Sequence, residues 1–123
     1  MVDTTILAFV LLFLKHFIID FPMQMKYQYL NKGTYGHPGG ILHAALHIVG
    51  SMVVLYPVIG YTALVTIVCA IEGIVHYHID WAKMNINRIK GWKCNTHEEF
   101  WILTGFDQLL HYLTYASMVY VLV

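Results

Sequence analysis

The chain has 123 residues, of which 59 % are apolar and only 11 % are charged, and its formal net charge is zero. A soluble domain is about a quarter charged, so this composition excludes an ordinary soluble domain and indicates a single integral membrane domain, residues 1–123. Because acidic and basic residues balance, nothing favours nucleic-acid binding. Cys69 lies in an apolar run and Cys94 in a polar one, which predicts neither a disulfide nor a CxxC metal site.

Four apolar stretches predict four membrane-spanning helices, and hence an all-α four-helix bundle. Each has roughly the 17 to 24 residues that ~30 Å of hydrocarbon requires at 1.5 Å per residue. In chain order they cover about residues 4–21, 40–56, 61–81 and 100–123. The first begins after Asp3 without a basic residue, which predicts a retained span and not a signal peptide. It ends before Pro22, because proline disfavours helix at the preceding residue. Pro57 and Gly60 predict a short turn between the second and third spans.

Two polar loops, 22–39 and 82–99, connect these spans in pairs. Thr96 and Glu99 have the spacing of a capping box, which predicts that they open the fourth helix. Six of the seven basic residues lie in the two loops: Lys26, Lys32, Lys83, Arg88, Lys90 and Lys93. By the positive-inside rule both loops are cytoplasmic and both termini lie on the non-cytoplasmic side. We therefore expect a multi-pass protein of the inner membrane, in contact with membrane lipid.

Each predicted span contains ionisable residues four positions apart. A four-residue step places two side chains on one helix face, one turn apart. The sets are His16 and Asp20, His43 and His47, Glu72, His76 and Asp80, and Asp107 and His111. All four sets fall in the cytoplasmic half of the predicted bundle, where an ionisable group is costly unless it has a partner. We therefore predict that they converge in one polar cluster in the core of the bundle.

Histidine and carboxylate together are typical of transition-metal sites, whereas calcium and magnesium prefer oxygen ligands. The hypothesis is that the cluster binds one or two divalent ions, zinc first, with iron or manganese as alternatives. The candidate metal ligands are His16, Asp20, His43, His47, His76, Asp80, Asp107 and His111. With Glu72, five histidines and four carboxylates are available. One ion cannot use them all, so two ions, or one ion with a shell of orienting residues, fit better.

Whether the protein is an enzyme stays open, but such a site favours a metal-dependent hydrolase at the inner leaflet. A bound ion lowers the pKa of its water and supplies hydroxide. Glu72 or Asp80, when not a ligand, is the candidate general base. Lys83 and Gln24 are candidates for binding the substrate, which could be a lipid headgroup, an isoprenoid phosphate or a peptide. Lys15 is expected to extend its amine toward the membrane surface.

Other functions also stay open. Intramembrane histidines and carboxylates mark the paths of proton or divalent-metal carriers and channels, although the outer half of the predicted bundle has no comparable residues. A histidine-box di-iron oxygenase or a haem-binding subunit would also use histidines, but haem needs few carboxylates nearby. A non-catalytic partner subunit with a structural metal is the last alternative. The sequence leaves open a homo-oligomer or a larger membrane complex.

Four motifs carry a resemblance to a known family. They are HFIIDFPMQ at 16–24, HAALH at 43–47, HYHIDWAK at 76–83 and GFDQLLH at 105–111. Together they resemble a family of small bacterial and phage inner-membrane proteins that is a domain of unknown function. The resemblance covers nearly the whole chain and implies no activity. A more distant likeness, to membrane-bound metal-dependent hydrolases, rests on scattered His and Asp in small multi-span proteins. Histidine-box oxygenases share the HxxxH element, but this chain lacks their HxxHH boxes.

Overall fold

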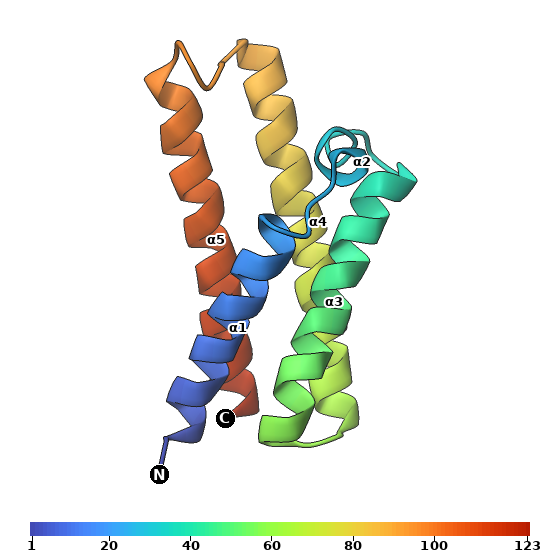
Figure 1. Cartoon of the computed structure of the whole chain (residues 1–123), viewed down its shortest axis with the longest axis vertical. Helices are drawn as coiled ribbons and strands as arrows, with labels where there is room; N and C mark the ends of the chain where they lie inside the picture. The colour runs from blue at the N-terminus through green and yellow to red at the C-terminus, as the bar shows by residue number, and fades with distance from the viewer.

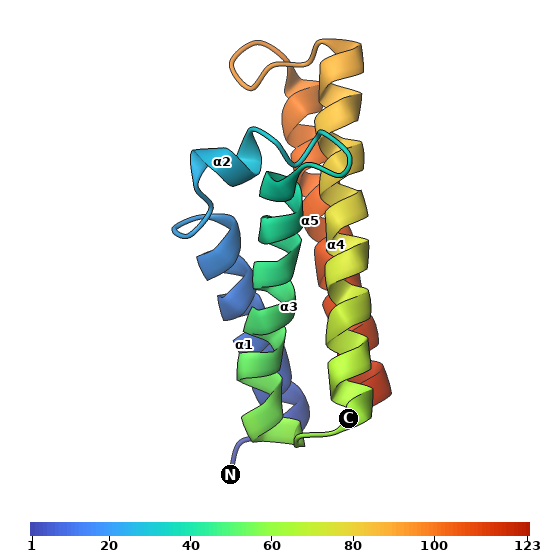
Figure 2. The ribbon, with the colours of Figure 1, turned by 90° about the vertical axis from the view of Figure 1, so that its right-hand side faces the viewer.

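The computed structural model describes residues 1–123 as an all-helical protein, as the sequence predicts. The helices are α1 (Thr4–Asp20), α2 (Lys26–Tyr29), α3 (Pro38–Ile59), α4 (Ala63–Lys90) and α5 (Glu98–Leu122). The four long helices run up and down, and both termini lie at one end with the α3–α4 turn (Figure 1). The short α2 and the α4–α5 connection lie toward the opposite end (Figure 2). Two helices, α3 and α4, are long enough and apolar enough to cross a membrane.

Side-chain caps begin three of the long helices. Asp3 accepts hydrogen bonds from the first turn of α1, and its contact with Thr5 is the main cause that lowers the pKa of the Asp3 carboxyl group. At α3, the His37 ring accepts a backbone hydrogen bond, and Pro38 occupies the first helical position, where its missing N–H costs nothing. Thr62 caps α4 in the same way. Each cap satisfies backbone donors that a helix start leaves unpaired.

Two helices extend beyond the predicted spans. α3 does not turn at Pro57 but continues through it, because an internal proline removes only one helical hydrogen bond. The helix ends at Gly60, where φ is 123°. α4 continues past Trp81 to Gly91, whose φ of 69° stops it. The predicted 82–99 loop is therefore mostly helix, since polar sequence marks the end of a hydrophobic span but does not end a helix.

The capping box predicted at the start of the fourth span is wrong. The cap position of α5 is His97, whose side chain makes no capping hydrogen bond. The Thr96 hydroxyl lies 2.8 Å from His97 Nδ1 instead of bonding to the backbone of Glu99. Glu98 and Glu99 still occupy the first turn, where a negative charge interacts favourably with the helix dipole.

Close approach between helices brings the functional side chains together. α3 packs extensively against both α1 and α4, and α5 packs mainly against α4. Gly50 of α3 faces α1, and a Cβ there would lie 2.6 Å from Ile19 Cδ1 and 2.9 Å from Lys15 Cγ. Gly73 of α4 likewise leaves room for the side chain of Ile48 on α3. Glycines at these two contacts let the backbones approach closely enough for short polar side chains to meet.

The interior of the bundle has an apolar part and a polar part. The apolar core consists of Ala8, Leu12, Leu55, Val65, Cys69, Tyr115, Met118 and Val119. Of the 26 buried residues, 13 are polar or charged, whereas large apolar side chains such as Ile6, Val53, Ile71 and Phe106 are exposed. Polar residues inside and apolar residues outside reverse the usual pattern of a soluble protein, and such a surface is typical of contact with lipid or with another protein.

Candidate metal centre

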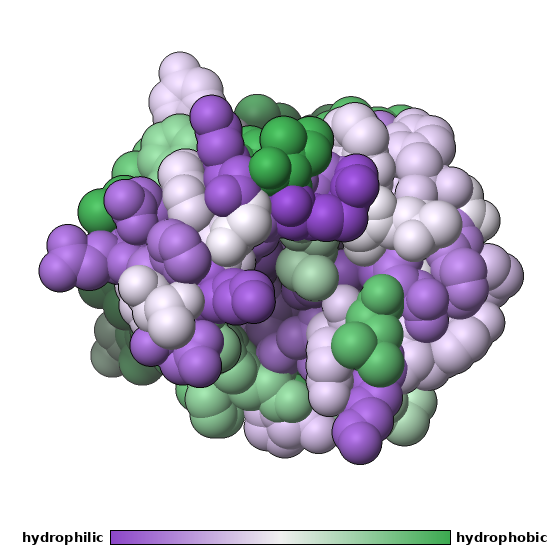
Figure 3. Space-filling model, turned by 90° about the horizontal axis from the view of Figure 1, so that it is seen from above, coloured by the Kyte–Doolittle hydropathy of each residue, from purple (hydrophilic) through white to green (hydrophobic).

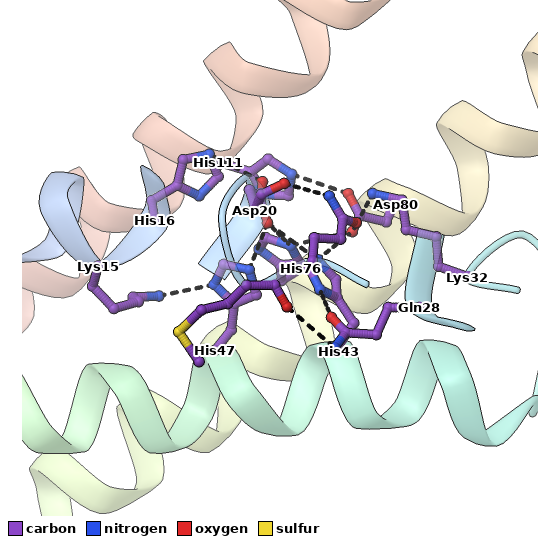
Figure 4. A network of polar contacts seen from close by, with 12 residues as sticks. Lys15, His16, Asp20, Gln28, Lys32, His43, His47, His76, Asp80 and His111 are labelled. Atoms are coloured by element: carbon purple, nitrogen blue, oxygen red, sulfur yellow. Dashed lines mark hydrogen bonds and ion pairs between the residues drawn. The ribbon is translucent and has the colours of Figure 1, made fainter. Parts of the chain in front are cut away.

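The ionisable residues of the four long helices meet in one buried cluster, as the four-residue spacing predicts (Figure 4). We define the His/Asp cluster as His16, Asp20, His43, His47, His76, Asp80, Asp107 and His111; Glu72 adjoins it. None of these nine residues is more than 6 % exposed. Three Asp and five His side chains from four helices therefore share one site.

The first group of potential ligands surrounds Asp20. Its Oδ1 lies 2.7 Å from His47 Nε2 and 3.1 Å from His43 Nε2. The same oxygen lies 3.6 Å from His76 Nε2. A tetrahedral ion with bonds of roughly 2.0–2.1 Å holds its ligand atoms about 3.3 Å apart. The four residues, which come from α1, α3 and α4, could therefore hold a metal ion.

The second group contains His76, Asp80 and His111, and it could hold an ion as well. Asp80 Oδ1 lies 3.3 Å from His111 Nε2, and its Oδ2 lies 3.2 Å from His76 Nε2. The His76 ring lies between two other imidazoles, with centroids 3.6 Å from His47 and 4.0 Å from His111. This stacking places the two groups side by side.

Several nitrogens of the cluster are buried and have no hydrogen bond. They include His43 Nε2 and both ring nitrogens of His76, although buried polar atoms are nearly always paired. His43 Nδ1 lies 3.0 Å from Gln28 Oε1 and donates to it, which leaves the Nε2 lone pair facing Asp20 and Asp80. A lone pair that faces carboxylate oxygens is favourable only with a proton or a cation between them. A metal-binding histidine also usually donates a hydrogen bond from its other ring nitrogen, as His43 does to Gln28.

His16, a predicted ligand, lies at the edge of these groups. Its Nδ1 lies 2.8 Å from the Tyr115 hydroxyl. Its Nε2 lies 2.8 Å from Gln108 Oε1 and 3.2 Å from Asp20 Oδ2. Because both ring nitrogens have partners, this arrangement suits His16 to orienting Asp20.

Asp107 lies beside His111, and its Oδ1 is 3.3 Å from His111 Nε2. Its Oδ2 accepts from Lys83 at 3.2 Å. Lys83 and Asp107 line a mostly apolar groove of about 430 Å³ between α4 and α5. Gln24, the other predicted substrate-binding residue, donates to the carbonyl of Asp20, and its Oε1 is buried without a partner.

Lys15 points into the bundle, which corrects the expectation that it reaches the membrane surface. Its amine donates to Glu72 Oε1 at 3.0 Å and lies 3.1 Å from His47 Nδ1 and 3.3 Å from the Tyr115 hydroxyl. Ser51 donates to the other Glu72 oxygen at 3.1 Å. Glu72, a predicted general base, therefore has both oxygens engaged. An inward lysine is favourable here because the carboxylate of Glu72, on α4, pairs with its amine.

Two contributors from the segment between α1 and α3 were not predicted from the sequence. Gln28 binds His43, and Lys32 Nζ lies 3.3 Å from Asp80 Oδ2. Both side chains are buried. They lie four positions apart, the same step that separates the ionisable residues of the long helices, so this spacing could have identified them despite the polar sequence around them.

The cluster lies beneath the end of the bundle that carries α2. Seen from that end, hydrophilic residues surround a recess at the centre of the molecule (Figure 3). A lateral groove of about 540 Å³ between α1 and α5 also reaches His16 and Gln108. The site is therefore buried but has approaches from the polar end and from the side.

Comparison with known proteins agrees with the motif resemblance. Residues 8–123 match the family described as "Protein of unknown function (DUF3307)", and this range contains all four motifs. No curated protein and no solved structure matches the chain. The chain thus belongs to the DUF3307 family, a domain of unknown function.

Proposed function

We propose that this protein is an integral membrane metalloprotein that hydrolyses a substrate at the inner leaflet. On this proposal α1, α3, α4 and α5 all cross the membrane. The apolar side chains exposed on each of them support this topology, because they would contact lipid while the His/Asp cluster stays inside. Six basic residues lie toward the end that carries α2, which favours a cytoplasmic position for that end and an outer position for both termini.

A zinc ion bound by Asp20, His43, His47 and His76 is the centre of the proposal. The observation that carries it is the convergence of three histidine Nε2 atoms on Asp20 Oδ1 in a buried site. Two of these histidines, His43 and His76, leave Nε2 without a hydrogen bond. Mixed nitrogen and oxygen ligation favours zinc, with iron or manganese as alternatives.

For hydrolysis, a water would have to join the four protein ligands of the ion as a fifth, and the ion would lower the pKa of this water toward ~7. Attack of this water on an ester, phosphate or peptide group would break the bond to the leaving group, which would take up the proton that the water releases. Asp80 adjoins the ion site and is placed either to bind a metal or to accept the proton of the water. Glu72, held by Lys15 and Ser51, would instead keep Lys15 against His47. Lys83 in the α4–α5 groove would contact an anionic part of the substrate. Gln24, which bonds to the Asp20 carbonyl, would contact the substrate near Asp20.

The apolar core argues against the carrier alternative. Between the Lys15–Glu72 pair and the end with the termini, the interior is filled by buried residues such as Leu12, Leu55 and Val65. A proton or metal ion would have to cross this layer without a polar partner, which costs several kcal/mol or more. A site that is closed toward the end with the termini suits catalysis or structural metal binding better than transport across the membrane.

Elemental analysis of the detergent-purified protein, with its visible spectrum, tests the proposal. We expect about one zinc or more per chain and a large loss of metal in His47→Ala. His78→Ala is the matched control, because His78 is exposed and bonds outside the cluster. Iron would favour the oxygenase alternative and a Soret band would indicate haem. Wild-type protein that neither contains metal nor gains stability from zinc, iron or manganese would refute the proposal.

The hydrolase step needs its own assay. Metal-loaded protein in mixed micelles is incubated with lipid phosphates, lipid esters and short peptides, and the released product is measured. We expect turnover that chelation abolishes and zinc restores. Metal binding without turnover on any of these substrates would favour the partner-subunit alternative.

A further inference from the structure

We propose that the cluster holds a second metal ion, bound by Asp80, Asp107 and His111 and joined to the first ion through Asp80. This inference rests on the proposed function, which places the first ion among Asp20, His43, His47 and His76. It assigns Asp80 to metal binding, the first of the two roles for which its position is suited.

The two oxygens of Asp80 face different histidines. Oδ2 lies 3.2 Å from the Nε2 atoms of His43 and His76, which belong to the first site. Oδ1 lies 3.3 Å from His111 Nε2, which is outside it. A carboxylate placed in this way can bind one ion through each oxygen. Ions that cooperate in hydrolysis lie about 3.5–4 Å apart, a distance that one carboxylate can span.

The other two ligands of the proposed second site lie next to each other on α5. His111 Nε2 lies 3.3 Å from Asp107 Oδ1, and that oxygen is buried without a hydrogen bond. The His111 ring stacks on His76, which keeps its Nε2 beside the first site. Three protein ligands leave a position for water, as is usual in catalytic metal sites.

Charge makes the two sites unequal. Asp20 forms its ion-pair contacts with histidines alone. In the second site, by contrast, Asp107 pairs with Lys83 at 3.2 Å, whereas Lys32 contacts Asp80 through Oδ2, the oxygen that faces the first site. A second ion must therefore compete with the Lys83 ammonium group for the Asp107 carboxylate. The first ion should bind tightly, and the second should bind more weakly until a lysine is removed.

Cobalt titration of the metal-free, full-length protein in detergent tests this inference. Absorption and equilibrium dialysis report the bound cobalt, and EPR reports whether two ions are coupled. We expect two equivalents, the second at least about tenfold weaker than the first. The EPR signal at two equivalents should be smaller than twice the signal at one, because ions about 4 Å apart couple.

Variants separate the sites. His111→Ala should retain one tight equivalent and lose the second. Lys83→Met should strengthen the second equivalent by about tenfold or more without changing the first, because it removes a competing charge. Lys90→Met is the matched control, since Lys90 is an exposed lysine on the same helix, and it should change neither.

One equivalent of cobalt with an uncoupled signal would overturn the second site and leave the proposed function standing. A second equivalent that persists unchanged in His111→Ala would also overturn it. Protein that binds no cobalt would instead refute the proposed function. If His111→Ala does not fold, the wild-type stoichiometry and the coupling decide the question.

Discussion

Glu72→Gln should be among the most damaging single changes in this protein, because it leaves the buried Lys15 amine without its carboxylate. The two side chains meet at 3.0 Å, and neither is more than 3 % exposed. Breaking a buried ion pair from one side costs about 3–5 kcal/mol. Contacts from His47 and Tyr115 remain for the Lys15 amine, so we expect about 3 kcal/mol, the lower end of that range.

The double variant Lys15→Met, Glu72→Gln shows how much of the lost stability comes from the unpaired Lys15 charge. Replacing both partners removes the unpaired charge, so we expect most of the lost stability to return, to within about 1 kcal/mol of wild type. Unfolding of metal-free protein in mixed micelles, followed by circular dichroism, measures both variants. Arg88→Met is the control, because the exposed Arg88 bonds only to Asn85 and should change stability by less than about 0.5 kcal/mol.

A Glu72→Gln variant that unfolds like wild type would refute this reasoning. A double variant as unstable as the single variant would also refute it. The loss of stability would then come from the changed side-chain shape and not from an unpaired charge. The same variants test the link to the metal site. Lys15 lies 3.1 Å from His47 Nδ1, and in Glu72→Gln its positive charge is no longer neutralised by a carboxylate. Zinc binding should therefore weaken by about tenfold or more in Glu72→Gln and recover in the double variant, which removes both charges.

Zinc at about 100 times its dissociation constant should stabilise the wild-type protein by about 2.7 kcal/mol. Melting and elemental measurements should show that His47→Ala loses most of this stabilisation and most of the bound metal. The full stabilisation in the variant would exclude His47 as a ligand. Gly73→Leu should lower the melting temperature and the metal content together, because its side chain has no room against α3, whereas Gly105→Leu enters open space and should change the metal content little. In a background without native cysteines, a membrane-impermeant thiol reagent should label Tyr61→Cys from outside intact cells and Lys90→Cys only after lysis. The reverse pattern would overturn the proposed orientation.

The helical period explains how much of this site the sequence determines. A four-residue step on any helix puts two side chains on one face, so the pairing of Asp20 with His16 and of Asp107 with His111 follows from the chain alone. Hydropathy likewise predicts helices over the apolar stretches. It does not predict where they end, because the last turns of α4 are polar and stop only at Gly91.

Tertiary packing decided which groups become partners. The period gives a face but not the neighbour that the face meets, and that neighbour depends on contacts such as Gly50 against α1 and Gly73 against α3. These contacts turn Lys15 inward to Glu72. The segment between α1 and α3 adds Lys32 to Asp80 in the same way. Such pairings join residues far apart in the chain, so local periodicity carries no information about them, and only the packed helices bring their charges within reach.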